Sequence, residues 1–411
     1  MPETFNLGSY RPTVLQLGES SKNSVIRSFE ELEKFTGLTR TFNEAFSGCT
    51  NLQSISLPEG LTLIGQQAFY TLTNLVRCKL PSTLKKIGNN AFTGCTSLSD
   101  ITLPPSITSI GQGALTGGTQ LGGDIYLPNL VTLGPYGIFN GSQIESISSL
   151  GKITTAGGSI AANCTKLHTV VLPDTMVALP ASAFKGCTAL VNLTLPKELT
   201  SFGTSAFEGC SALTRVNLPQ SVTTIGIDVF KYCTLLAEIN LDKVNTISER
   251  AFLGCSSLVD CGDLSSLQSI GAQGLRDAKL VKEILSLPNL TSIGTQAFHS
   301  SSFTRIENLG SITSIALGNN NSRTLGTWDT IKSIVFPSTI TSIGGGDWYA
   351  ENKMEYMICH AETPPAVGDA AFLGNSNKCP IYVPDASVTA YREASTWIDN
   401  ADRIKPLSEL V

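Results

Sequence analysis

The sequence predicts a repeat solenoid: a right-handed superhelix of 23-residue coils, with short parallel strands on the concave face and a cap at each end. Two recurring landmarks predict this fold. An Ala-Phe pair or its equivalent recurs from Phe46 to Phe298 at steps of 22 to 24 residues. A Leu-Pro pair or its equivalent recurs from Leu57 to Leu309 at nearly the same steps. Because both landmarks keep one period, we interpret the chain as stacked repeats rather than separate globular domains.

Each unit follows the pattern L-x-x-I-x-L-P-x-x-L-T-x-I-G-x-x-A-F-x-G-C-T. The L-x-x-I-x-L stretch is too short for a helix and is followed by Pro, so it predicts a short strand. The L-T-x-I-G stretch predicts a second extended segment, and the Ala-Phe segment predicts a tight turn. We interpret the recurring glycines as turn residues that need a positive φ or close packing. No unit can bury its own Leu, Ile and Phe, so neighbouring units must stack.

The ends and interruptions of the pattern predict three regions. These are an N-terminal cap at 1–41, an array of about 13 coils at 42–356, and a C-terminal coil with a helical cap at 357–411. The array is irregular at 117–165 and 310–350. Insertions in repeat proteins map to loops on one face, where binding is often added.

Both caps carry local helix signals. In the N-terminal cap, Ser28 and Glu31 have the spacing of a capping box. In the C-terminal cap, Val388, Tyr391 and Ala394 fall at helical spacing. We therefore expect a short helix over each end of the solenoid.

Cysteine is the strongest candidate for chemistry, because seven of the 11 cysteines occupy one repeat position. They are Cys49, Cys95, Cys164, Cys187, Cys210, Cys233 and Cys255. The chain has no C-x-x-C pair, so this column predicts no zinc site. Disulfides between adjacent coils are conceivable, but the total is odd and small buried thiols are common in cores. We predict a column of reduced, buried thiols.

Other catalytic signals are lacking in the sequence. His168, His299 and His360 stand in no H-E-x-x-H or similar motif, and neither G-x-S-x-G nor a P-loop pattern occurs. We therefore predict no enzyme activity, no metal and no cofactor.

Composition limits the partners. The net charge is −5, which gives no electrostatic reason to expect nucleic acid or an anionic membrane as partner. No run of 18 apolar residues occurs, so we expect no membrane insertion by this chain. Residues 1–20 lack the basic start and apolar stretch of a signal peptide. The sequence leaves open whether the protein is not exported or a leader has been removed.

The outward positions of the L-x-x-I-x-L strands are the main binding candidates, because their residues vary from repeat to repeat while the apolar core positions stay the same. The residues flanking the central Ile point away from the core. Mixed charge and small polar groups favour a protein or glycan partner over a small molecule in a deep pocket. The candidate protein-binding residues are Arg77, Lys79, Asp100, Asp124, Tyr126, Arg215, Asn217, Glu238, Asn240, Arg305 and Glu307, and Ser54, Ser56, Glu283 and Leu285 are placed outward with them.

A second candidate patch is aromatic. Trp328, Trp348 and Tyr349, with Tyr356, cluster in the last irregular part of the array. Trp and Tyr often anchor interfaces. The alternative is that they fill the core of irregular coils.

The repeat units "AFSGCTNLQSISLPEGLTLIG", "AFTGCTSLSDITLPPSITSIG" and "AFKGCTALVNLTLPKELTSFG" resemble the BspA-like (Treponema-type) leucine-rich repeat. The segments "FTGLTR" and "IYVPDASVTAYREASTWIDNADRIKPL" are similar to the beginning and end of such arrays from Bacteroides-like bacteria. The resemblance covers roughly residues 35–407. It implies a leucine-rich repeat solenoid of a bacterial surface protein, a class in which some members adhere to host matrix proteins or to other bacteria. It thus implies an extracellular or cell-surface location.

Together these features favour a non-enzymatic interaction or adhesion module, which binds a host matrix protein, a cell-surface protein or a glycan through its strand face. Two alternatives stay open. One is a passive spacer or scaffold without its own ligand. The other is a polysaccharide-binding protein or hydrolase that uses the aromatic patch near residues 328–356. A hydrolase would need two juxtaposed carboxylates beside those aromatics. We expect a monomer.

Overall fold

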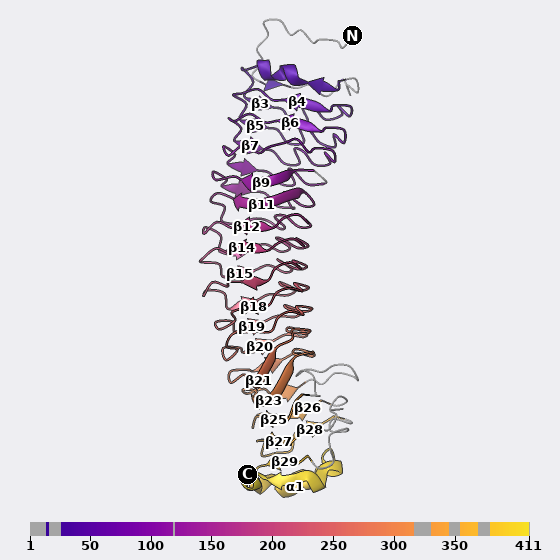
Figure 1. Cartoon of the computed structure of the whole chain (residues 1–411), viewed down its shortest axis with the longest axis vertical. Coiled ribbons are helices and arrows are strands. Elements are labelled where there is room, and N and C mark those ends of the chain that lie inside the picture. The colour runs from indigo at the N-terminus through magenta and orange to yellow at the C-terminus, as the bar shows by residue number, and fades with distance from the viewer. Residues whose placement is uncertain are drawn as a thin grey trace. The chain divides into compact units, whose positions relative to one another are not determined.

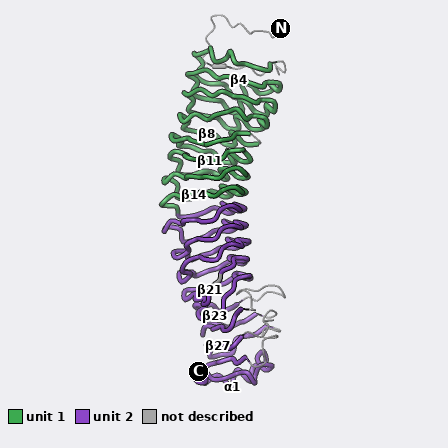
Figure 2. Tube along the Cα trace, in the orientation of Figure 1, with its two compact units in different colours: residues 1–199 green, residues 200–411 purple. Residues whose placement is uncertain are grey.

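A computed structural model of the chain describes residues 14–15, 26–117, 120–315, 330–344, 354–368 and 379–410. The chain divides into two compact units, residues 1–199 and 200–411 (Figure 2). Each unit is a stack of short coils (Figure 1). The described residues form about 15 turns about 23 residues apart, which confirms the predicted solenoid. Parallel pairing also occurs within the segment predicted as the N-terminal cap, where Ser28 lies opposite Ser54, and within the predicted C-terminal coil and cap, where Ile381 lies opposite Ile404.

The L-x-x-I-x-L stretches form the first parallel ladder in each unit. Their central residues, such as Ile55, Cys78 and Ile147, are buried, as the alternation of a strand requires. In the first unit the strands are β2 (Ser28–Phe29), β4 (Ser54–Ser56), β6 (Arg77–Lys79), β9 (Gly122–Tyr126), β11 (Gln143–Ser149), β12 (Thr169–Val171) and β14 (Asn192–Thr194). In the second unit they are β16 (Arg215–Val216), β18 (Glu238–Ile239), β21 (Val281–Ser286), β23 (Ser302–Asn308), β25 (Ser333–Phe336), β27 (Tyr356–Cys359), β29 (Ile381–Val383) and β30 (Ile404–Pro406).

The L-T-x-I-G stretches form a second parallel ladder in each unit. Its paired residues keep the repeat register; for example, Ile64 lies opposite Ile87. In the first unit the strands are β1 (Val14–Leu15), β3 (Arg40–Thr41), β5 (Leu63–Ile64), β7 (Lys86–Ile87), β8 (Ser109–Ile110), β10 (Thr132–Leu133) and β13 (Ala178–Leu179). In the second unit they are β15 (Ser201–Phe202), β17 (Thr224–Ile225), β19 (Thr246–Ile247), β20 (Ser269–Ile270), β22 (Ser292–Ile293), β24 (Ser314–Ile315), β26 (Ser342–Ile343) and β28 (Ala366–Val367).

The Ala-Phe segments form the predicted turns, which are also linked from coil to coil. The backbone N–H of Phe46 donates to the carbonyl of Ala68, and that of Phe69 donates to Ala91, both at 2.8 Å. The rings of Phe46, Phe69 and Phe92 stack with centroids 4.8 Å apart. Each coil therefore buries its Phe against the Phe of the coils on either side.

The two recurring glycines have different roles. Five of the seven cysteines in the column follow a glycine with a positive φ, as at Gly94 (φ +79°), where the lack of a Cβ avoids steric strain. Asn163 and Tyr232 adopt the same conformation before the other two. The glycine that ends each second-ladder strand lies against the backbone of the preceding coil. A Cβ at Gly88 would come within 2.7 Å of the backbone nitrogen of Gln66. The sequence predicted that these glycines serve either a positive φ or close packing. The first holds for the glycine before the cysteine and the second for the glycine that ends the second-ladder strand.

The N-terminal cap differs from the prediction. Ser28 does not cap a helix but lies in β2, where its hydroxyl accepts a hydrogen bond from Ser54 at 3.0 Å. The helical turn that follows, η1 (Glu30–Lys34), is a 3₁₀ helix without a side-chain cap. The capping box is therefore wrong, because pairing of Ser28 with β4 extends the ladder into this segment.

The C-terminal helix is confirmed. The helices here are η2 (Asp385–Ser387), α1 (Val388–Glu393), η3 (Ile398–Arg403) and η4 (Leu407–Glu409). Tyr391 is buried and donates its hydroxyl proton to the carbonyl of Ala361 at 2.9 Å. Trp397 packs edge-on against Tyr391 and donates to the carbonyl of Pro365 at 2.8 Å. These two aromatic residues seal the last coils of the second unit.

The predicted buried thiol column is confirmed. All 11 cysteines lie within the described residues, and each is buried and outside any disulfide. The thiols donate to the backbone carbonyl at the Phe position of the preceding coil: Cys95 to Phe69 at 3.0 Å, and Cys233 to Phe207 at 3.2 Å. The thiol is thus a second donor to a carbonyl that already accepts a backbone N–H within its own turn, as Phe207 does from Cys210 at 3.1 Å.

These thiols make stability sensitive to alkaline pH. Burial raises the pKa of the Cys95 thiol to about 12. Between about pH 9 and 12 the unfolded chain loses this proton while the folded chain keeps it, so stability falls as pH rises. Each such thiol can contribute a loss of about 1.4 kcal/mol per pH unit. Urea midpoints at neutral pH and at about pH 10.5 will check this. A Cys95→Ala variant should lose less stability than the parent chain over that interval, and an equal loss would contradict the assignment.

Candidate interaction surface

The outward side chains of the first ladder recur from coil to coil in each unit, and we call them the strand lane. Each position is fixed by parallel pairing, for example Ser54 with Arg77 and Thr169 with Asn192. Neighbouring strands in such a ladder lie about 4.8 Å apart, so adjacent lane residues can contact one another. The backbone therefore presents variable side chains on a rigid and regular frame.

In the first unit, the cations predicted for binding are held in ion pairs. Arg77 Nε lies 3.3 Å from Asp100 Oδ2, on the next coil. Lys79 Nζ lies 3.1 Å from Glu33 Oε2, on η1. All four side chains are about half exposed, so each pair contributes little to stability. Their charges are nevertheless compensated within the chain.

The helical turn η1 also covers the start of the lane. Ser56 was expected to point to solvent, but it is only 2% exposed and donates its hydroxyl proton to the carboxylate of Glu30. Partial burial opposes ionisation of Glu30, but hydrogen bonds from Ser56 and Ser54 and the charges of Arg77 and Lys79 lower its pKa. The outward prediction for Ser56 is therefore wrong, because the N-terminal cap packs on it.

The centre of the first unit has the longest strands in that lane. Asp124 accepts hydrogen bonds from Ser146 Oγ at 2.6 Å and from the backbone N–H of Ser148 at 3.1 Å. Tyr126 is 55% exposed on the same strand. The irregular region predicted at 117–165 thus contains extended strands, which Figure 1 shows as the broad arrows β9 and β11.

In the second unit, the predicted residues fall into two groups. Arg215 and Glu238 form an ion pair between neighbouring strands, while Asn217 and Asn240 beside them are exposed. Arg305 and Glu307 are also exposed, and within the described residues neither has an ionic partner. The structure thus brings the first four together and places the last two apart from them on β23.

One strand of this lane has a different register from the prediction. Leu285 was placed outward, but it is buried and lies opposite Ile306, while Ile284 is 42% exposed and lies opposite Arg305. Glu283 is exposed as predicted. Pairing with β23 decides which of two adjacent apolar residues enters the core. Ile284 is therefore a lane residue that the sequence pattern missed.

A network of charges on the Ala-Phe turns of the second unit was also missed. Asp228, which is 8% exposed, accepts two hydrogen bonds from Arg250 at 2.9 and 3.1 Å. Lys231 lies 3.3 Å from Glu208 and 3.6 Å from Asp228. Partial burial opposes ionisation of Asp228, but the hydrogen bond from Arg250 and the charge of Lys231 lower its pKa. Because these groups satisfy one another across coils, we interpret the network as structural.

Most of the predicted aromatic patch lies beyond the described part of the chain. Trp328, Trp348 and Tyr349 lie outside the described residues. Tyr356 is partly buried in β27 and packs edge-on against Tyr382, with ring centroids 6.4 Å apart. The one aromatic residue of the cluster that is described therefore contributes to packing.

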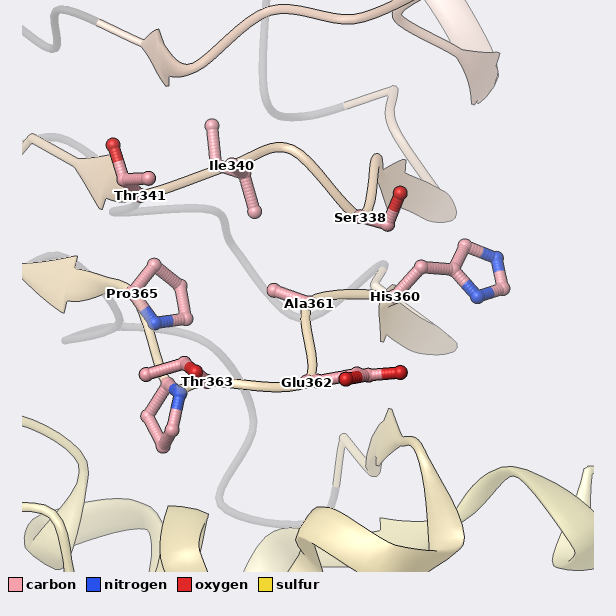
Figure 3. A pocket seen from close by; sticks show the side chains of 9 residues that line it. Ser338, Ile340, Thr341, His360, Ala361, Glu362, Thr363 and Pro365 are labelled. Carbon is pink, nitrogen blue, oxygen red and sulfur yellow. The ribbon is translucent and has the colours of Figure 1, made fainter.

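A shallow hollow of about 420 Å³ lies between the turns that follow β25 and β27. In Figure 3 the side chains of His360 and Glu362 point to one side of the chain, while Ile340 and Pro365 lie on the other. Small-molecule sites combine apolar walls with polar groups that converge on the ligand. These polar groups do not converge, so the hollow is a poor candidate for a catalytic or small-molecule site.

The described part of the chain contains neither a cluster of metal-ligating side chains nor a membrane-spanning helix. No group of three or more His, Cys, Asp or Glu side chains there is placed to hold a metal ion. None of the helices there is long and apolar enough to cross a membrane.

Comparison with known proteins identifies the repeat. The BspA type leucine rich repeat region, in six copies, matches residues 26–145, 158–273 and 263–377. No curated protein matches the chain. Repeat proteins of this family are generally non-enzymatic binding modules, which suggests a role in protein interaction.

Several solved structures are similar to this chain. A leucine-rich repeat protein from Bacteroides ovatus is 21% identical, with a TM-score of 0.51 and coverage of 90% of this chain and 88% of that chain. A leucine rich cell surface protein from Faecalibacterium prausnitzii is 23% identical, with a TM-score of 0.38 and coverage of 75% and 79%. A leucine-rich repeat protein from T. pallidum is 30% identical, with a TM-score of 0.31 and coverage of 43% and 72%. Because the repeat match spans well over half of its length, this chain belongs to the BspA-type leucine-rich repeat family.

Proposed function

We propose that the chain is a non-enzymatic interaction module that binds a protein partner through its strand lane. The observation that supports this most directly is the lane itself. Tyr126, Arg305 and Glu307 are exposed on parallel strands whose registers are fixed, and Asn217 is exposed directly after β16. A preformed surface loses little conformational freedom on binding, which favours affinity. Exposed Tyr and Arg side chains are the types that most often anchor protein interfaces.

We further propose that the partner is a host matrix protein or a protein on another cell, and that the module is displayed on a bacterial cell surface. The resemblance of the repeat units to BspA-type repeats supports this proposal. Adhesion would then depend on shape and on many modest contacts along the lane, without a cofactor.

A label-free binding screen will test this function. The purified chain is passed over immobilised fibronectin, fibrinogen, laminin, collagen and a glycan panel. We expect saturable binding to at least one matrix protein. A Tyr126→Ala/Asn217→Ala/Arg305→Ala variant should bind at least about tenfold more weakly, because interface anchors typically contribute more than about 1 kcal/mol each.

A matched variant carries Thr223→Ala and Thr291→Ala, two exposed residues beside the second ladder. It should bind like the parent chain. Equal loss in both variants would argue against the strand lane. No binding across the whole panel would favour a passive spacer, and binding to glycans alone would contradict a protein partner.

A further inference from the structure

The strand lane of the first unit keeps uncompensated negative charge once its ion pairs are considered. Its two cations are already engaged, Arg77 with Asp100 and Lys79 with Glu33. Glu145, on β11, is exposed, as is Asp124 on β9, and neither has a cationic partner among the described residues. The sequence predicted a lane of mixed sign, but intramolecular pairing removes the positive charge from it.

The backbone fixes both carboxylates on neighbouring strands. Asp124 lies opposite Ser146 and is held by hydrogen bonds from Ser146 Oγ and Ser148 N. Glu145 is the extra residue of a β-bulge, because Ile144 and Ser146 pair with consecutive residues of β9. Bulges redirect side chains and recur within families at functional positions. The bulge here turns Glu145 to solvent next to the strand that carries Asp124.

An exposed aromatic ring and open space accompany the two carboxylates. Tyr126 follows Asp124 by two residues, so both side chains emerge on the same side of β9. Gly123, which precedes Asp124, has no side chain, and a Cβ there would meet no atom within 4 Å. A partner can therefore approach β9 closely beside Asp124. We call Asp124, Tyr126 and Glu145 the β9–β11 face.

Carboxylates beside an aromatic ring suit one kind of side chain. Lysine and arginine form charge-assisted hydrogen bonds with carboxylates, and their cations are attracted to the face of a tyrosine ring. His168, which directly precedes β12, contacts Thr169 Oγ1 at 2.9 Å. Among the described residues, no Lys, Arg or His side chain forms an ion pair with Asp124 or Glu145, so both carboxylates are available to a cation of another molecule.

We propose that the β9–β11 face binds an extended segment of the partner protein that carries lysine or arginine. This inference rests on the proposed function, in which the strand lane is the interaction surface. The lane's remaining charge thus sets the chemical class of partner, because charge complementarity steers association and discourages acidic proteins.

Fluorescence anisotropy with a synthetic peptide of alternating lysine and threonine tests the proposal. The same peptide with every lysine acetylated is the uncharged control. We expect the parent chain to bind the lysine peptide and not the acetylated one, and affinity should fall as salt rises. Asp124→Asn with Glu145→Gln should weaken binding by about fivefold or more, and Tyr126→Ala by about two- to fivefold.

The matched control is Glu198→Gln, which removes an exposed acidic charge of the first unit between β14 and β15, away from the β9–β11 face, without releasing a paired cation. Its affinity for the peptide should equal that of the parent chain. If Glu198→Gln weakens binding as much as the β9–β11 variants, the peptide responds only to net charge and the proposal fails. It also fails if the lysine peptide does not bind. The proposed function would stand, but this face would be overturned, if Asn217→Ala or Arg305→Ala weakens binding to a matrix protein while the β9–β11 variants bind it like the parent chain.

Discussion

Replacing Phe69 with alanine is expected to lower the free energy of unfolding of the first unit by about 3–5 kcal/mol. The ring is fully buried and is stacked on both sides, with centroids 4.8 Å from those of Phe46 and Phe92. Its loss leaves a cavity that neighbouring coils cannot fill, because backbone hydrogen bonds on both sides hold them at the repeat spacing. Each repeat contacts its neighbours, so the damage affects two interfaces at once.

Urea titration followed by circular dichroism measures this effect, and hydrogen exchange locates it in the first unit. The control is Phe42→Ala, which truncates the same side chain where it is 37% exposed. That variant should change stability by less than about 1 kcal/mol, since exposed substitutions cost little. Similar losses in the two variants would show that the stacked column does not hold the coils together.

Replacing Gly151 with alanine is expected to be severe for a different reason. A Cβ at this position would lie 2.3 Å from the carbonyl oxygen of Leu130 and 2.5 Å from its backbone nitrogen. That carbonyl accepts the backbone hydrogen bond of Lys152 at 2.7 Å, which joins two coils. The φ of +64° adds a penalty of about 1–2 kcal/mol for any residue with a Cβ. We expect a total loss above about 3 kcal/mol, because the coils must also separate.

Gly123→Ala separates these two contributions. Gly123 also has a positive φ, of +75°, but an added Cβ would meet nothing within 4 Å. Urea midpoints should show a loss near 1–2 kcal/mol for Gly123→Ala and a larger one for Gly151→Ala. If the two variants lose equal stability, backbone conformation alone accounts for the glycine. Gly310 has the same surroundings, with Leu290 in place of Leu130, so Gly310→Ala should behave like Gly151→Ala in the second unit.

Most of the fold follows from periodicity alone. The recurrence of Ala-Phe and Leu-Pro determines the coil length, and alternation within each strand determines that residues such as Ile55 and Ile147 are buried. The cysteine column was also predictable, because a residue repeated at one position of a stacked coil must have the same environment in each. Conversely, the capping box at Ser28 failed because local helix signals compete with pairing to β4, which no local pattern reports.

The candidate surface was predictable in position but not in chemistry. Alternation is sufficient to place Arg77, Asp124 and Arg305 outward, and they are exposed. Whether a lane cation is available for a partner depends on side chains a coil or more away, as the pairs Arg77–Asp100 and Lys79–Glu33 illustrate. The choice between Ile284 and Leu285 likewise depends on the register with β23.

The sequence by itself determined the length of the repeat, the apolar core positions and the face on which the variable residues lie. All three depend only on spacing along the chain. Tertiary structure decided the rest. It decided that η1 covers Ser56, that a bulge directs Glu145 to solvent, and that the cations of the first unit's lane are neutralised. These outcomes depend on contacts between coils about 23 residues apart or more. A repeating sequence pattern shows that coils stack, but it does not show which individual side chains come within contact distance across them.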